Sequence, residues 1–77
     1  MPRLPMISGK GMCKLLEKIG FSKIHQVGSH IRFIHVNGRK TVVPVHGAEE
    51  LGVGVLKEIL KQAGLSRRDY EILRKKL

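Results

Sequence analysis

A histidine at position 30 follows a Gly28-Ser29 step and opens a run of β-branched and aromatic residues. Gly and Ser are typical of tight strand connections, so His30 is predicted to stand at the rim of a sheet, where a strand begins. An imidazole titrates near neutral pH and can act as a general base or a general acid. A packed strand residue, a metal ligand and a proton-transfer group are all open readings of His30 at this point.

The metal reading is the weakest of the three. Of the other histidines, His35 and His46 share a face of the predicted strands, but at about 3.3 Å per residue they lie roughly 20 Å apart. No carboxylate accompanies the histidines, and their spacings match no usual zinc pattern. The sequence therefore predicts no metal site and no cofactor, and His25 and His35 are interpreted as surface residues.

Cleavage of RNA is a reaction that one histidine can serve without a metal. The substrate carries its own nucleophile, the 2′-hydroxyl, so the protein has to bind the strand, move protons and stabilise charge on the phosphate. Arg32 lies two residues along the strand from His30 and is expected on the same face, where it could stabilise a phosphate. For Arg32, Arg39 and Lys40, phosphate contact and a solvated, charged sheet face are about equally supported. For His30 itself, an ordinary strand histidine remains the simpler reading on these grounds.

The charge of the chain favours a polyanionic partner. Fifteen Lys and Arg stand against six Asp and Glu, which gives a formal charge of +9, and nucleic acid is the first candidate.

Residues 1–77 are expected to form one small domain. No stretch approaches the ~20 apolar residues that a spanning helix needs, and the N-terminus lacks a secretory pattern. The chain has one cysteine, Cys13, and so cannot form an internal disulfide. A cytoplasmic location is therefore expected. Cys13 itself is interpreted as an inert structural thiol.

Helical and strand patterns follow one another along the chain. Apolar residues at helical spacing predict a helix over about 9–19, with Ser8 as N-cap and with Lys10, Lys14 and Lys18 on its outer side. Three short antiparallel strands are expected at about 21–27, 30–36 and 39–45. A second helix is expected at about 53–63, and a short third helix after the N-cap residue Ser66.

The hairpin between the second and third strands sets the expected register. Asn37-Gly38 is the preferred pair for a two-residue type I′ turn, which places His30 opposite Val45 and Ser29 opposite His46. His30 and His46 then meet at the open end of the hairpin but point to opposite faces. The order of elements predicts an α+β sandwich in which the helices share one face of the three-stranded antiparallel sheet.

Four segments stand in this order along the chain: "SGKGMCKLLEKIGF", "QVGSH", "TVVPVHG" and "LKEILKQAGLSRRDYE". In this order they resemble the HicA family of small bacterial and archaeal mRNA interferase toxins. The resemblance implies a fold similar to a double-stranded RNA-binding domain, with α-β-β-β-α order. It also implies metal-independent cleavage of mRNA, with His30 as the catalytic residue, and neutralisation by a cognate HicB antitoxin. The antitoxin surface is expected to be acidic.

Further site residues follow as expectations. Ser29, Arg32 and His46 are candidate auxiliary residues, His46 through its match to the family's "PVHG" segment, whose role is interpreted as mainly structural. The chain departs from the family pattern at Ile31, where many members carry a second histidine. The candidate RNA-binding residues are Lys10, Lys14, Arg32, Arg39 and Lys40.

Two other functions compete with the toxin ribonuclease. A noncatalytic module of the double-stranded RNA-binding type would bind duplex RNA without cleaving it. Against this module, the segment before the second helix, "AEELGVG", is acidic to neutral where such a module would need phosphate contacts. A DNA-binding regulator would need a recognition helix, but the second helix offers Lys57 and Lys61 beside its apolar face.

Overall fold

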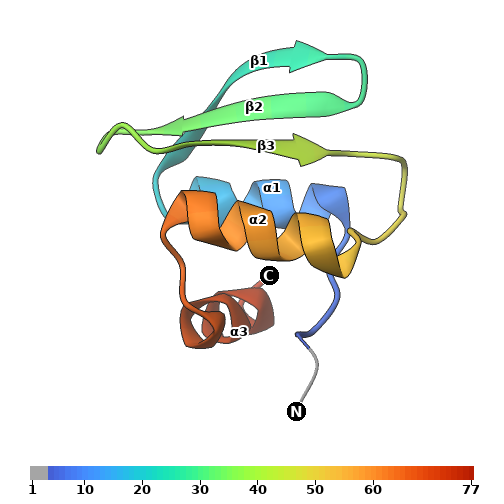
Figure 1. Cartoon of the computed structure of the whole chain (residues 1–77), viewed down its shortest axis with the longest axis vertical. Helices are drawn as coiled ribbons and strands as arrows, with labels where there is room; N and C mark the ends of the chain where they lie inside the picture. The colour runs from blue at the N-terminus through green and yellow to red at the C-terminus, as the bar shows by residue number, and fades with distance from the viewer. Residues whose placement is uncertain (1–3) are drawn as a thin grey trace.

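A computed structural model describes residues 4–77 as three layers (Figure 1). The sheet is the first layer, α1 and α2 lie side by side beneath it, and α3 lies on the far side of these two helices. The predicted α+β architecture, similar to a double-stranded RNA-binding domain with a short extra helix, is confirmed. The elements are α1 (Gly9–Lys18), β1 (Phe21–Val27), β2 (His30–His35), β3 (Lys40–Pro44), α2 (Val53–Ala63) and α3 (Arg67–Lys75).

The helix ends are where the capping residues place them. The Ser8 hydroxyl accepts a hydrogen bond from the Gly11 amide at 3.0 Å, which starts α1 at the expected residue. Gly64 ends α2 with a positive φ of 74°, a conformation that suits glycine. Ser66 and Asp69 form a reciprocal capping box at the start of α3. Val53, the first residue of α2, is exposed.

The hairpin between β2 and β3 differs from the expected one. Ile34 pairs with Lys40, and the His35 amide donates to the Arg39 carbonyl, so that the loop contains the three residues 36–38. Gly38 has a φ of 93° and no other residue of this loop has a positive φ, whereas a type I′ turn needs two such residues. The expected two-residue turn is therefore wrong, and the register shifts by one residue.

The sheet has the order β1-β2-β3 and is covered by helices on one face. Residues that point inward join the side chains of α1 and α2 in one core, while none of the helices within residues 4–77 covers the opposite face of the sheet (Figure 1). The buried side chains with the largest volumes are Tyr70, Phe33, Met12, Leu15, Leu16, Leu56, Ile59 and Val43. Burying such side chains supplies the main stabilisation of a domain this small.

The third helix fastens the N-terminal segment to the helical layer. Tyr70 is fully buried, and its hydroxyl donates a hydrogen bond to the Pro5 carbonyl. Arg74 Nε donates to the Met6 carbonyl at 2.9 Å. Because both acceptors precede α1, α3 holds the chain that leads into the first helix. Within residues 4–77, no helix is long and apolar enough to span a membrane.

His35, expected at the surface, is instead half-buried and joins three elements. Its Nδ1 accepts the Asn37 amide at 3.1 Å, so Nε2 carries the proton and donates to the Ile19 carbonyl at 2.8 Å. Its ring also meets that of Phe21 edge-on, with centroids 5.0 Å apart. His35 thus links the end of α1, the start of β1 and the hairpin loop.

Replacing His35 by alanine is expected to lower the free energy of unfolding by about 1–3 kcal/mol, because two hydrogen bonds and an aromatic contact are lost. The matched control is Val36→Ala, since the neighbouring Val36 is 95% exposed and such a change costs less than about 0.5 kcal/mol. Urea denaturation measures both variants. Equal midpoints for the two would contradict a structural role of His35.

Candidate active site

His30 is the first residue of β2 and follows a tight turn. Val27 pairs with His30 across the two-residue turn Gly28-Ser29. Gly28 has a φ of 58° while Ser29 has no positive φ, a combination typical of a type II′ hairpin turn. The His30 side chain is exposed. The expected placement of His30 at the rim of the sheet is confirmed, and the turn supports the residue from a strand rather than from a mobile loop.

Pro44 is the direct neighbour of His30 on the adjacent strand. The two are paired in the register, and the Val45 amide donates to the Ser29 carbonyl at 2.7 Å beside them. Pairs that alternate with hydrogen-bonded ones bring their Cα atoms to about 4.5 Å, so these two side chains lie close together. Proline fits this position because β3 is an edge strand and needs no N–H donor toward solvent.

The corrected register changes the relation between His30 and His46. In the observed register His30 pairs with Pro44, and His46 comes two positions after Pro44. Positions two apart on a strand share a face, so the shift of one residue removes the reason for placing the two histidines on opposite faces. His46 is exposed and lies beyond the end of β3. Its carbonyl accepts the Glu49 amide at 3.0 Å, within the turn that leads toward α2. Ser29, the other auxiliary candidate, is half-buried within the turn itself.

The uncovered face of the sheet carries cations among apolar side chains. Arg32 pairs with His25 on one side and with Val42 on the other, and all three are exposed. Strand alternation puts Arg32 on the same face as His30, as expected. Lys40 pairs with Ile34 one row further along. This surface can meet both phosphates and bases.

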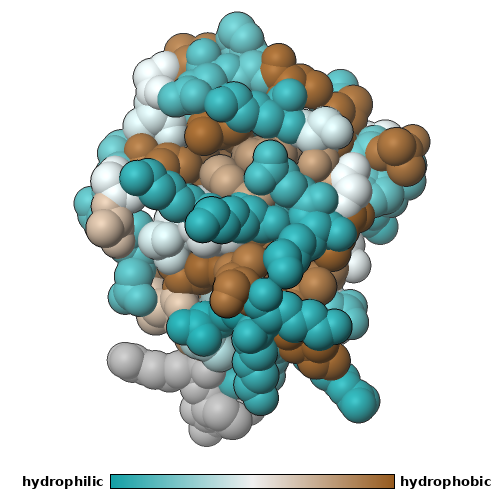
Figure 2. Space-filling view, turned by 180° about the vertical axis from the view of Figure 1, so that it is seen from behind, coloured by the Kyte–Doolittle hydropathy of each residue, from teal (hydrophilic) through white to brown (hydrophobic). Residues whose placement is uncertain are grey.

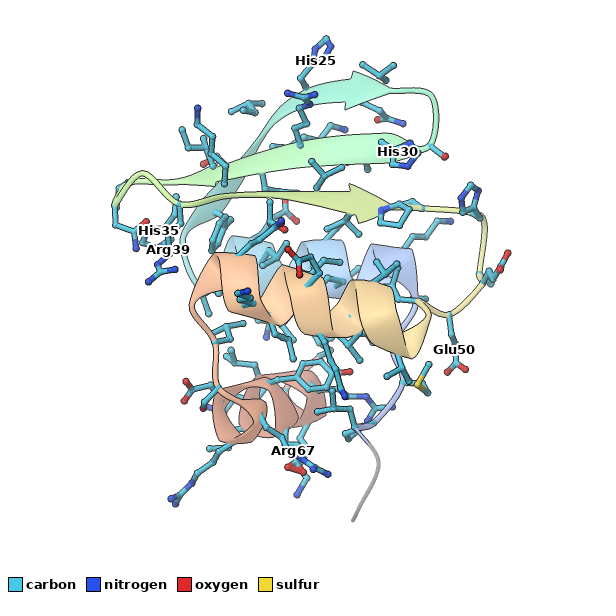
Figure 3. All side chains as sticks on the ribbon, in the orientation of Figure 1. His25, His30, His35, Arg39, Glu50 and Arg67 are labelled. Carbon is cyan, nitrogen blue, oxygen red and sulfur yellow. The ribbon has the colours of Figure 1, made fainter. Side chains whose placement is uncertain are left out.

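Arg39 lies at the opposite end of the sheet from His30. Figure 3 shows His30 beside the turn between β1 and β2, and Arg39 with His35 beside the hairpin loop. A Cβ on Gly64 would stand 2.8 Å from Arg39 Cζ, so this guanidinium packs against the end of α2. Arg39 is thus remote from His30. Among the residues expected to bind RNA, Arg32 is the one that lies near His30 on β2.

Lysines of α1 form part of the surface seen from behind. Lys10, Lys14 and Lys18 are exposed, and Figure 2 shows hydrophilic side chains across the middle of this face, at the level of α1. Gly9 is buried, and a Cβ there would be 2.4 Å from the Pro44 carbonyl oxygen. The start of α1, with Lys10, therefore lies against the strand end that flanks His30.

Both N-terminal ends of α1 and α2 lie at the same end of the molecule as His30 (Figures 1 and 3). Helix N-termini carry partial positive charge and amides that lack partners inside the helix. The Gly52 N-cap makes no side-chain capping bond, and α2 has no acidic residue in its first turn. The amides in the first turn of α2 are therefore available to hydrogen-bond acceptors of a ligand, next to the acidic pair Glu49 and Glu50.

Two features near His30 could not be found by sequence reasoning. The contact of Gly9 with Pro44 joins residues far apart in the chain. The second feature is the pair Glu49 and Glu50, which line a depression beside Pro44. In the sequence they are visible only as two adjacent acidic residues in a basic chain, which does not indicate that they lie near His30. Among residues 4–77, no group of three or more His, Cys, Asp or Glu side chains is arranged to hold a metal ion.

Cys13 is half-buried and packs against the core. Burial, reinforced by the nearby Glu17 carboxylate, raises the pKa of its thiol above the usual value of 9.0. The thiolate is the nucleophilic form, so this thiol is poorly suited to catalysis at neutral pH.

The alkylation rate of Cys13 tests this interpretation. Iodoacetamide at pH 8 is expected to modify the native protein several-fold more slowly than the urea-unfolded protein, because burial lowers both thiolate content and access. Raising the pH should speed the native reaction through and above pH 9. Equal rates in the two states, measured by mass spectrometry, would contradict an inert thiol.

Comparisons with known proteins identify the family of the chain. Residues 9–65 match the family model described as the HicA toxin of bacterial toxin-antitoxin. A relative from Pseudomonas fluorescens (strain Pf0-1), "Probable mRNA interferase HicA", is 53% identical over 38 residues, which are 49% of this chain and 62% of that protein. The chain thus spans less than two thirds of that relative. Because the family model covers more than half of the chain, from α1 to the end of α2, the chain belongs to the HicA family of bacterial toxin–antitoxin toxins.

Proposed function

We propose that this protein is the toxin of a toxin–antitoxin pair and acts as a metal-independent endoribonuclease on mRNA, with His30 as its catalytic residue. The observation that carries the proposal is the exposed position of His30 on a tight turn, at the end of the domain where α1 and α2 begin. The family match and the name of the relative, an mRNA interferase, support it.

The proposed reaction is an internal transesterification. A base removes the proton of the 2′-hydroxyl, its oxygen attacks the adjacent phosphorus, and the bond from phosphorus to the 5′-oxygen breaks. The leaving oxygen takes up a proton, so the products are a 2′,3′-cyclic phosphate and a 5′-hydroxyl. His30 transfers one of these protons, and Arg32 on the same face stabilises the negative charge of the phosphate.

The substrate strand would run from His30 along the uncovered face of the sheet. Arg32 lies two residues from His30 on β2, and Lys40 lies further along the same face, toward the hairpin loop. Lys10 stands at the start of α1, which lies against Pro44, and Lys14 is exposed one turn further along this helix. Arg39, at the hairpin end, would contact RNA that extends along the sheet. Single-stranded RNA suits this surface, since its bases can meet the apolar side chains between the cations.

A HicB-type antitoxin is the proposed protein partner. The family is one of toxin–antitoxin pairs, and a protein of charge +9 is complemented by an acidic surface. An antitoxin that covers His30 would exclude RNA from the same face. Its site of action, like that of the toxin, would be the cytoplasm, where mRNA is translated.

Cleavage of single-stranded RNA in EDTA tests the proposal. Purified protein is expected to produce fragments with 2′,3′-cyclic phosphate ends, and added Mg²⁺ should not be required. Cleavage that is abolished by EDTA would overturn the metal-independent mechanism. RNA binding without cleavage would instead favour the noncatalytic double-stranded RNA-binding module, and duplex RNA should then bind more tightly than single strands.

A further inference from the structure

We propose that the depression at the end of β3 is a nucleobase pocket, which selects guanine next to the phosphate that is cleaved. The inference rests on the proposed function, because it names a base of the same RNA substrate. The depression has a volume of about 220 Å³, below the ~300–1,000 Å³ of pockets for drug-sized ligands. Its lining residues are Pro44, His46, Glu49, Glu50, Leu51, Gly52 and Val55.

The pocket begins at the residue that pairs with His30. Pro44 lines the depression and is also the cross-strand neighbour of His30, at a Cα separation of about 4.5 Å for a pair of this type. In RNA each base is joined to its phosphates through one sugar. A phosphate held at His30 therefore brings a neighbouring base within reach of the pocket.

The charge of the pocket is opposite to that of the molecule. Two of the six acidic residues, Glu49 and Glu50, line it together. A carboxylate repels phosphate but accepts hydrogen bonds from the N–H groups of a base. Pro44 and Val55 provide apolar contacts for the faces of the ring. These residues fit a base rather than a second phosphate.

Guanine complements this combination best. Its Watson–Crick edge presents two adjacent donors, N1–H and the N2 amino group, which match the two oxygens of one carboxylate. Its O6 is an acceptor, and the first turn of α2, which follows the N-cap residue Gly52, offers amide donors on the same rim. Adenine, cytosine and uracil each present at most one donor group on this edge.

The loop that carries the glutamates is held in place before RNA binds. Ser8 and Glu50 form an antiparallel bridge, and the Leu51 amide donates to the Ile7 carbonyl at 2.8 Å. Leu51 itself is buried. Figure 3 shows Glu50 on this loop, at the same end of the molecule as His30. The backbone of the loop therefore needs little ordering when a base binds, while the exposed Glu49 and Glu50 side chains are free to turn toward it.

Binding of short RNAs tests the pocket separately from cleavage. The His30→Ala variant is mixed with labelled hexanucleotides that differ at one central position, guanine, inosine or adenine, and affinity is read by fluorescence anisotropy. Guanine is expected to bind roughly ten-fold more tightly than inosine, which lacks the N2 amino group. Adding Glu49→Gln and Glu50→Gln should remove the preference. Glu17→Gln, on α1, is the control for the change in charge and should retain it.

Cleavage by the otherwise unchanged protein provides the second readout. Cuts are expected next to guanine, and the double glutamine variant should cut with little base preference. Equal affinity for the three RNAs, or a preference that survives the double substitution, would overturn the pocket. Cleavage without guanine preference would overturn the pocket and keep the proposed function. Selective binding by a protein that cleaves no RNA would keep the pocket and overturn the ribonuclease.

Discussion

Replacing His30 by alanine is expected to lower the rate of RNA cleavage by about 10²- to 10⁴-fold, the range for loss of a general acid or base. The side chain is exposed and belongs to no part of the buried core, so the thermal midpoint should change little. RNA affinity should also persist, since the surrounding cations are unchanged. A time course with labelled single-stranded RNA, in EDTA, measures the effect.

His25→Ala is the matched control for this variant. His25 is also an exposed strand histidine, one row away from His30 on the sheet and opposite Arg32. Its loss should leave cleavage within about two- to three-fold of the parent, as expected for a surface contact to RNA. Equal losses in the two variants would indicate a general effect of charge on binding. Full activity of His30→Ala would assign the chemistry to another residue.

The structure shows where a histidine at position 31 would lie. Ile31 is half-buried and packs against the core, on the inner face of the sheet. Successive residues of a strand point to opposite faces. A second histidine at position 31 would therefore face the helices, where it could not reach the same phosphate directly. Ile31 therefore contributes to packing, and the role proposed for His30 does not involve this position.

Local signals in the sequence were sufficient for the helices. The Ser8 and Ser66 hydroxyls accept hydrogen bonds from the Gly11 and Asp69 amides, in the first turns of α1 and α3. Gly64 supplies the positive φ that ends α2. These effects depend on residues within one turn of each other, so they can be predicted from spacing. The α+β architecture followed from the same patterns.

The hairpin loop shows where local signals were insufficient. Asn37-Gly38 favours a two-residue turn, but Asn37 Oδ1 accepts the Arg39 amide at 2.9 Å and the Asn37 amide donates to His35 Nδ1. These side-chain bonds stabilise a three-residue loop instead. His35 is held there through Ile19, which belongs to a distant element. The register of β3, and with it the partner of His30, thus depended on a contact that spacing could not show.

The candidate site, like the fold, was predictable where local signals decide the structure and not where long-range contacts do. The Gly28-Ser29 turn is a local signal, so the position of His30 and the face of Arg32 could be predicted. The pairing with Pro44 and the neighbouring glutamates depend on the packing of β3 against α1 and on the path into α2. Both are long-range features, for which no spacing in the chain is diagnostic.

Replacing Gly9 by alanine is expected to lower the free energy of unfolding by about 2–4 kcal/mol, near the upper end for an overpacked position. An added Cβ would lie 2.4 Å from the Pro44 carbonyl oxygen and 2.9 Å from Val45 Cα. Both contacts are with backbone, so no side chain can turn aside. The start of α1 and the end of β3 would have to separate, and thermal or urea denaturation measures the loss.

Gly54→Ala is the control for the Gly9 substitution. Gly54 lies in the first turn of α2, and an added Cβ there meets no atom within 4 Å. Alanine should therefore raise stability by about 0.5–1 kcal/mol, through its better helix propensity. Opposite signs for the two variants would establish that close approach, rather than the loss of a glycine, decides the effect. A neutral Gly9→Ala would mean that α1 can shift away from Pro44. Because Pro44 pairs with His30, RNA cleavage by a folded Gly9→Ala protein would then report how closely catalysis depends on this strand end.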